Sequence, residues 1–296
     1  MYKIITDGSC DLTNEQVKEN NLEVVPFYVS TDGETHQKEG IDIKVRDFYQ
    51  FMVDHKTIFP KTSMPSVEDY AVVFEKYLKQ NIDIICICIT TKFSGSYNSA
   101  NVAMEMMKED YPDRKITVID ATVNTVLQGL MVLEIAKLQK NGASYEEVVE
   151  SFEERKSSGR IFFTVGSFDY LIHGGRIGKV AGVAAQTLGI KPLIVLKEGE
   201  IFAFGVARGR KKSLRKVIDE MINHFEKNHI DPSTYTICVG YGYDKEEGEE
   251  FRHNVIEALE THFPGYHPDI LLQQIGATIG VHTGPYPLGV GLTKKA

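Results

Sequence analysis

The chain has 296 residues, of which 42% are hydrophobic and 25% are charged, and its formal net charge is -8. This composition is typical of a globular protein with one large domain or two ordinary ones, and the acidic balance argues against a whole-chain nucleic-acid binder. No apolar run approaches the roughly 18 residues of a membrane-spanning helix, and the N-terminal run is too short for a signal peptide. We therefore expect a cytoplasmic protein that does not bind nucleic acid.

The cysteine and histidine spacing gives no support for a metal site. The four cysteines form no C-x-x-C pair, and they are Cys10, Cys86, Cys88 and Cys238. Three of them lie in apolar runs typical of strands. The nine histidines show no H-E-x-x-H spacing. We predict reduced, buried cysteines and no bound metal.

The first half of the chain alternates predicted strands and helices. Apolar runs typical of strands cover residues 2–7, 22–29, 82–89 and 115–121. Helical spacing covers a short segment after Thr13, then 45–55, 67–80, a segment reaching about 108, and 125–142. The run 82–89 is apolar on both faces, as expected of a central parallel strand. The alternation predicts a parallel sheet flanked by helices.

The second half follows a different pattern. Its predicted elements are a strand at 160–165, a hairpin over 191–209, a helix at 212–227, a strand at 235–241, a helix at 245–262 and a strand at 269–276. This order is typical of an α+β fold. We predict an N-terminal Rossmann-like, parallel-sheet α/β domain at 1–155 and a C-terminal α+β domain at 156–296.

The segment GVHTGPYPLGVG at 280–291 places His282 and Thr283 before a run rich in glycine and proline. Glycine is conformationally free and proline lacks a backbone donor, so we expect a loop rather than a helix or a central strand. One interpretation is a polar clamp for a small ligand group. The other is a closing turn that carries a surface histidine.

Hydroxyl-rich segments lie at or near the expected carboxyl edge of the parallel sheet. They contribute Thr62 and Ser63 before one predicted helix, and Ser94 and Ser96 before another. Backbone N–H groups at helix starts favour an anion, so these hydroxyls are candidate donors to a carboxylate or phosphate. The alternative is that they only cap helices.

Several common sites are absent from the sequence. There is no G-x-x-x-x-G-K-[ST] and no G-x-G-x-x-G after the first strand, which excludes a P-loop and a dinucleotide fingerprint. In KFSGS, Lys92 stands where a nucleophile elbow needs its first glycine. A serine hydrolase assembled from Ser94, His282 and Asp120 remains an alternative function.

The segment GGRIGKVAGVAAQTLGI at 174–190 combines an anion-binding side chain with small residues. Arg176 can form a fork-like contact with an anion. The helix expected after it consists mostly of small apolar residues, namely Val180, Ala181, Gly182, Val183, Ala184, Ala185 and Leu188. It could wall a narrow apolar channel or pack tightly against a sheet. A polar clamp beside an apolar wall suits a fatty acid.

With these segments, the chain resembles the DegV family of bacterial fatty-acid-binding proteins nearly end to end. The motifs that carry the resemblance are ITDGSCDL at 5–12, TSMPS at 62–66, FSGSYNSA at 93–100, VIDATVNTVLQGL at 118–130, YLIHGGRIG at 170–178, IKPLI at 190–194 and IGVHTGPYPLGVG at 279–291. Gly8 and Met64 depart from the family pattern, in which serine and glutamine are usual.

The resemblance implies two domains that enclose a long-chain fatty acid such as palmitate, with no cofactor and no chemistry of their own. It implies that Thr62 and Ser94 hydrogen-bond the carboxylate, that His282 lies close to it, and that Arg176 lies near the opening. The same motifs supply the remaining expected ligand-binding residues, Ser63, Gly95 and Thr283.

The resemblance also implies a partner. Some family members are the lipid-carrying subunit of fatty acid kinase and present the carboxylate to a separate catalytic subunit. A lipid-sensing regulator without a kinase is an alternative. The one dense basic run, ARGRKKSLRK at 207–216, is either a solvated helix start or a transient contact with an anionic membrane or the partner.

Overall fold

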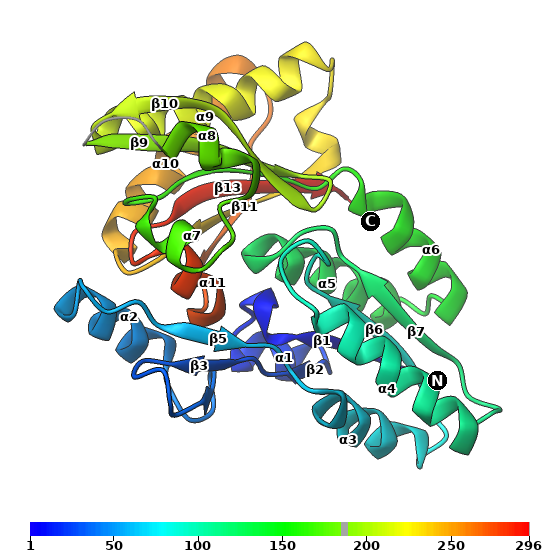
Figure 1. The fold of residues 1–296 in the computed structure, drawn as a ribbon. Helices are drawn as coiled ribbons and strands as arrows, with labels where there is room; N and C mark the ends of the chain where they lie inside the picture. The colour runs from blue at the N-terminus through cyan, green and yellow to red at the C-terminus, as the bar shows by residue number, and fades with distance from the viewer. Residues whose placement is uncertain (185–188, 296) are drawn as a thin grey trace.

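The computed structural model describes residues 1–184 and 189–295, which form an α/β structure (Figure 1). A parallel four-stranded sheet and a mixed six-stranded sheet each carry helices, and a three-stranded sheet lies beside the first. Helix α11 (Ala277–Thr283) lies between the two larger sheets.

The four-stranded sheet is parallel throughout, as predicted. Its order is β2 (Glu23–Val25), β1 (Tyr2–Asp7), β6 (Asp83–Cys88) and β7 (Ile116–Asp120). Alternate residues of β6 face opposite cores, because successive side chains of a strand point to opposite faces. Ile84 and Cys86 pack against α3 (Val67–Leu78) and α4 (Ser96–Asp110), whereas Ile85 and Ile87 lie on the side of α5 (Thr125–Lys140) and α6 (Tyr145–Lys156).

Three helices of this half begin at capping boxes. The side chains of Thr13, Ser66 and Ser144 each accept a hydrogen bond from a backbone N–H in the first turn of α1 (Asn14–Glu19), α3 and α6, respectively. Each cap satisfies a donor that has no partner within the helix.

The predicted strand at 22–29 is two strands in different sheets. Pro26 interrupts the run because it cannot donate to a sheet ladder. β2 joins the parallel sheet, and β3 (Tyr28–Ser30) turns away from it. The three-stranded sheet has the order β4 (Gln37–Lys38), β3 and β5 (Lys61–Ser63), and α2 (Val45–Asp54) connects β4 to β5.

The six-stranded sheet uses only strands of the second half. Its order is β10 (Glu200–Arg208), β9 (Ile190–Lys197), β8 (Arg160–Thr164), β13 (Leu288–Lys294), β11 (Tyr235–Tyr241) and β12 (Ile270–Gln274). The helices α9 (Arg210–Lys227) and α10 (Lys245–His262) cover one face. The other face turns toward the N-terminal half.

The expectation of a loop at 280–291 is wrong. Residues 277–283 form helix α11, and β13 is an inner strand paired with β8 and β11. Gly291 stands in β13 because α5 packs closely on the sheet there. A β-carbon at Gly291 would meet Leu127 Cβ at 3.2 Å and Cys238 Sγ at 3.0 Å. The glycines therefore allow close packing rather than a loop.

The segment after α7 (Asp169–His173) contains two short helical turns, η2 (Gly178–Val180) and α8 (Ala181–Ala184). The predicted small-residue helix continues to Ala185 and Leu188, which lie outside the described residues. The remaining short turns are η1 (Gly8–Cys10) and η3 (Pro232–Thr234).

The largest apolar cluster joins the two halves of the chain. It contains Val126 and Leu127 of α5 together with Ile161, Leu196 and Cys238 of the six-stranded sheet. The four cysteines are buried and form no disulfide, in agreement with the prediction of reduced core residues. The division into domains at 155 stays a prediction, because this packing crosses it.

Candidate functional site

A cavity of about 540 Å³ lies between the two larger sheets. Most of the residues that line it are apolar. They come from the end of β6, the start of α5, the inner face of the six-stranded sheet and α11. The cavity therefore lies where elements of both halves meet.

The six-stranded sheet forms one wall through two rows of inward-facing residues. Strand pairing aligns Ile201, Leu196, Ile161, Gly291 and Cys238 as one row. All five line the cavity. They face the same side because they pair across neighbouring strands.

The second row lies two residues closer to α11 along β13. It consists of Phe163, Gly289 and Gly240, which also line the cavity. Following β13 from Leu288 to Gly291 leads away from α11 and toward the deep end of the cavity. We call the row through Ile161 and Gly291 the deep row.

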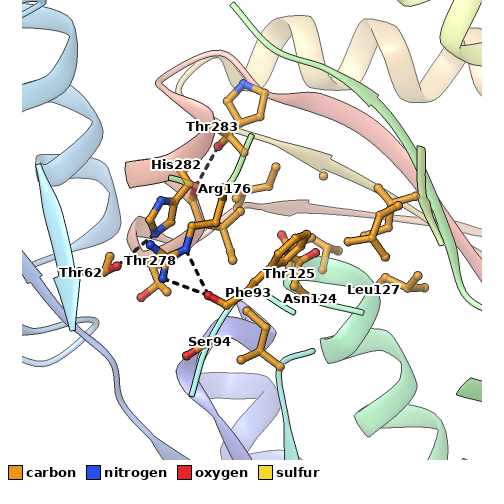
Figure 2. Close-up of a pocket in the computed structure, with 18 of the residues that line it drawn as sticks. Thr62, Phe93, Ser94, Asn124, Thr125, Leu127, Arg176, Thr278, His282 and Thr283 are labelled. Carbon is orange, nitrogen blue, oxygen red and sulfur yellow. Dashed lines mark hydrogen bonds between the residues drawn. The ribbon is translucent and has the colours of Figure 1, made fainter. Parts of the chain in front are cut away.

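Polar side chains gather at the opposite end, which we call the mouth. Figure 2 shows Thr62, Ser94, Arg176 and His282 on the side away from Leu127. Thr62 Oγ1 lies 3.1 Å from His282 Nε2, within hydrogen-bond distance. These side chains come from β5, the β6–α4 loop, the segment after α7, and α11.

His282 is packed closely against the end of α7. Its Nδ1 faces Gly174 so closely that a β-carbon there would lie 2.2 Å from the nitrogen. Burial, with a smaller contribution from the positive charge of Arg176, lowers the pKa of His282 from 6.5 to about 4. The imidazole is therefore neutral near pH 7.

Arg176 connects two segments beside the mouth. Its Nε and Nη2 donate to the Phe93 carbonyl oxygen at 3.2 and 3.0 Å, and its Nη1 donates to the Gly174 carbonyl oxygen at 2.7 Å. The side chain is exposed. Its charge therefore faces solvent while its donors hold the β6–α4 loop against the C-terminal half (Figure 2).

The loop that carries Ser94 is anchored by a buried carboxylate. Ser94 Oγ accepts the Ser96 N–H at 3.2 Å, and Ser96 Oγ donates to Asp7 Oδ2 at 2.8 Å. The same oxygen accepts the Ile89 N–H at 2.9 Å. Burial raises the pKa of Asp7, and these hydrogen bonds oppose that shift. Asp7 thereby fixes the end of β6 and the start of α4.

A second carboxylate positions α11. The backbone N–H of Thr278 donates to Glu39 Oε2 at 3.0 Å, and the N–H of Ala277 donates to Oε1. Sequence reasoning missed both carboxylates. An aspartate directly after an apolar strand is a usable signal for Asp7, but nothing local links Glu39 to a helix more than 200 residues away.

All seven residues expected to bind the ligand line this one cavity: Thr62, Ser63, Ser94, Gly95, Arg176, His282 and Thr283. Thr62 and Ser63 lie in strand β5, not at a helix start as expected. The Thr283 hydroxyl donates to the Ile279 carbonyl oxygen at 3.0 Å, so it already has a partner within α11.

The structure does not assemble the hydrolase triad considered as an alternative. Asp120 accepts hydrogen bonds from the Thr91 hydroxyl and the Thr122 N–H, each at 2.7 Å. His282 pairs with Thr62, and its Nδ1 has no hydrogen-bond partner within residues 1–184 and 189–295. A triad needs a carboxylate at this nitrogen to orient the imidazole.

No helix in the described part of the chain combines the length and the apolar character that a membrane crossing needs.

Comparisons with known proteins identify the family. Residues 1–295 match the family model "Uncharacterised protein, DegV family". A DegV domain-containing protein of Clostridium perfringens is 33% identical over 292 residues, which cover 98% of this chain and 96% of that protein.

Two solved structures are similar over nearly their whole length. A stearic acid-binding protein from Eubacterium ventriosum has a TM-score of 0.94 at 44% identity, covering 100% of this chain and 99% of that one. A DegV family protein from Thermus thermophilus, solved in a study of fatty acid binding, has a TM-score of 0.85 at 28% identity, covering 99% of each chain. On this evidence, the chain belongs to the DegV family.

Proposed function

We propose that this protein binds one long-chain fatty acid, such as palmitate or stearate, in the cavity between its sheets. Thr62 and Ser94 hold the carboxylate at the mouth beside His282, and the tail extends to the deep row. The observation that carries the proposal is the segregation of polar and apolar side chains to opposite ends of one cavity. The similarity to a stearic acid-binding protein supports it.

The apolar wall supplies most of the affinity. Each buried methylene contributes about 0.8 kcal/mol, so about 15 methylenes contribute roughly 12 kcal/mol before the costs of association and ordering, which are several kcal/mol. The carboxylate contributes position instead. Hydrogen bonds from the Thr62 and Ser94 hydroxyls offset part of its desolvation and fix where it lies.

The neutral His282 makes carboxylate binding depend on protons. A carboxylate near the imidazole favours the protonated ring, which raises the pKa of His282 from about 4. Binding therefore includes proton uptake as the pH falls toward that value.

We further propose that the protein is a carrier that presents the carboxylate to a separate kinase subunit in the cytoplasm. The mouth lies beside the exposed Arg176, so a partner docked there would meet the head group. Phosphoryl transfer depends mainly on positioning and charge stabilisation, which such a complex supplies. A transient membrane contact fits the exposed basic side chains Lys211, Lys212 and Arg215 at the start of α9.

Mass spectrometry tests the binding step. The purified protein is denatured, and its intact mass and its extractable lipid are measured separately. We expect a free fatty acid in the extract and an unmodified chain. An acyl adduct on Ser94 would support the hydrolase instead, and a chain that neither carries nor takes up fatty acid would overturn the proposal.

Reconstitution tests the carrier step. The loaded protein is mixed with a fatty acid kinase catalytic subunit and ATP, and acyl-phosphate is trapped with hydroxylamine. We expect the hydroxamate to form only when both proteins are present. Binding of fatty acid without acyl-phosphate formation, for every kinase subunit of the source organism, would favour the lipid-sensing regulator.

A further inference from the structure

One polar side chain inside the cavity, that of Asn124, has no hydrogen-bond partner in the described parts of the chain. Asn124 is 9% exposed and lines the cavity, yet its amide makes no hydrogen bond to any residue that the structure describes. The neighbouring threonines differ. The hydroxyls of Thr125, Thr278 and Thr283 donate to Asp11, Glu39 and the Ile279 carbonyl, respectively.

Helix capping does not explain an asparagine at this position. Asn124 is the N-cap residue of α5, where asparagine is favoured because its side chain can accept a backbone N–H of the first turn. Its side chain makes no such bond. Asn124 instead lines the cavity, without a bond to its own helix.

Asn124 lies between the mouth and the deep row. On one side, the carbonyl of the preceding residue, Val123, accepts the Thr90 N–H at 3.1 Å, which ties this segment to the loop that carries Ser94. On the other side, Leu127 reaches Gly291 in the deep row. An acyl chain that runs from the mouth to the deep row passes this amide.

A plain hydrocarbon chain would leave the amide unsatisfied. A carboxamide carries two N–H donors and one acceptor oxygen, and a buried polar group without a partner is costly. A hydroxyl is both a donor and an acceptor, so it can pair with either end of the amide. The environment of Asn124 thus favours an oxygen-bearing chain.

We propose that the cavity selects long-chain fatty acids that carry a hydroxyl group on the acyl chain, and that Asn124 is the residue that recognises this hydroxyl. The inference rests on the proposed fatty acid binding at this site. It adds a second polar contact, separate from the carboxylate contacts at Thr62 and Ser94, and it makes Asn124 a specificity-determining residue.

The test compares stearate with hydroxystearates whose hydroxyl lies at different carbons. Dissociation constants are measured for the parent protein and for Asn124→Leu and Asn124→Ala. Leucine is apolar and close to asparagine in size. Asn124→Ala provides a second test if the leucine variant folds poorly. Asn98→Leu, at an exposed position of α4, is the matched control.

We expect the parent to bind at least one hydroxystearate more tightly, relative to stearate, than either variant does. The expected change in this ratio is about tenfold, which is the size of one net hydrogen bond. Asn124→Leu is also expected to bind stearate more tightly than the parent, because it removes an unsatisfied amide. Asn98→Leu leaves every ratio unchanged.

An affinity ratio that is the same in the parent and both Asn124 variants at every hydroxyl position would overturn the inference while leaving the proposed function intact. If that unchanged ratio came with equally weakened binding of stearate and all hydroxystearates, Asn124 would be assigned to the carboxylate. Failure of the parent to bind any of these acids would instead overturn fatty acid binding itself.

Discussion

The mouth and the deep end of the cavity are built in different ways. The mouth is assembled from single side chains on four separate segments, and its groups depend on one another: Thr62 contacts His282, and Arg176 holds the Ser94 loop. The deep row comes from neighbouring strands of one sheet, in which the pairing register alone aligns Ile161, Gly291 and Cys238.

Because of this difference, the affinity for the tail and the position of the head group depend on different parts of the site. In the proposed complex, the many apolar contacts of the tail supply the affinity, which depends on how much of the tail is buried. A few hydrogen bonds give position, and each is sensitive to the segments that carry it. Changes at the mouth should therefore alter pH dependence and head-group recognition, whereas changes in the deep row should alter the preference for chain length.

The largest expected effect is the pH dependence that His282 imposes on the empty protein. Between its ordinary pKa of 6.5 and the lowered value of about 4, the unfolded chain protonates His282 and the folded protein does not. Stability is therefore lost as the pH falls through this window, by up to about 3 kcal/mol. Denaturant unfolding at a series of pH values measures it.

The variant His282→Gln should lack this component, so the difference in unfolding free energy between parent and variant should change between pH 6.5 and 4. His36→Gln, which removes an exposed histidine, serves as the control. A pH-independent difference between the parent and His282→Gln would mean that His282 is not held neutral.

The deep row should set chain length. Ile161→Phe fills space there, and excluding about three methylenes from burial would weaken stearate binding by roughly 50-fold. Decanoate, whose tail is shorter, should lose less than about threefold on the same reasoning. Isothermal titration calorimetry measures both.

Ile237→Phe is the matched control for this substitution. Ile237 is buried in the same sheet but packs in the opposite core, under α9 and α10. Its variant should lose stability through overpacking and keep the parent ratio of stearate to decanoate affinity. Equal ratios in both variants would show that the tail does not reach the deep row.

A smaller effect is expected from Ser94→Ala. Loss of one hydrogen bond to the carboxylate should weaken fatty acid binding by about tenfold while the unfolding midpoint changes little. The corresponding fatty alcohol, which lacks the carboxylate, should bind parent and variant with more similar affinities. Unchanged fatty acid affinity in the variant would remove Ser94 from the head-group site.

The smallest expected effect concerns Arg176. Its charge is the lesser cause of the lowered pKa of His282, so Arg176→Gln should raise that pKa only part of the way back toward 6.5. NMR titration of the His282 ring measures the change. Lys179→Gln, at an exposed residue paired with Glu200, should leave the titration unchanged. A pKa restored to 6.5 in Arg176→Gln would show that charge, not burial, dominates.

The parallel sheet could be predicted because its strands carry their own signal. Strand β6 is apolar at every buried position and is followed by a helix, so local pattern and tertiary environment agree. Strand β13 has no such signal, because Gly289 makes room for Phe163 of β8 and Gly291 makes room for Leu127 of α5, both more than 120 residues earlier in the chain. Pro26 is an intermediate case: a proline within the apolar run 22–29 is a local signal for the break between β2 and β3, but the surrounding apolar residues predict one continuous strand.

The mouth residues could be named from motifs, but their arrangement could not. Nothing in TSMPS or GVHTG indicates that Thr62 and His282 touch, and the cavity position of Asn124 depends on how α5 meets the β6–α4 loop. Glu39 is the extreme case, since its role is visible only once α11 is placed beside it.

Several residues of the apolar cluster that crosses from one half of the chain to the other also line the cavity. A lipid in this position would complete the interior of the protein rather than sit on its surface. Binding of the lipid would then stabilise the folded state, so the unfolding temperature should rise with occupancy of the cavity. Release of the lipid would require disruption of this interior packing. Opening of the mouth on contact with a recipient protein would then control the rate of release.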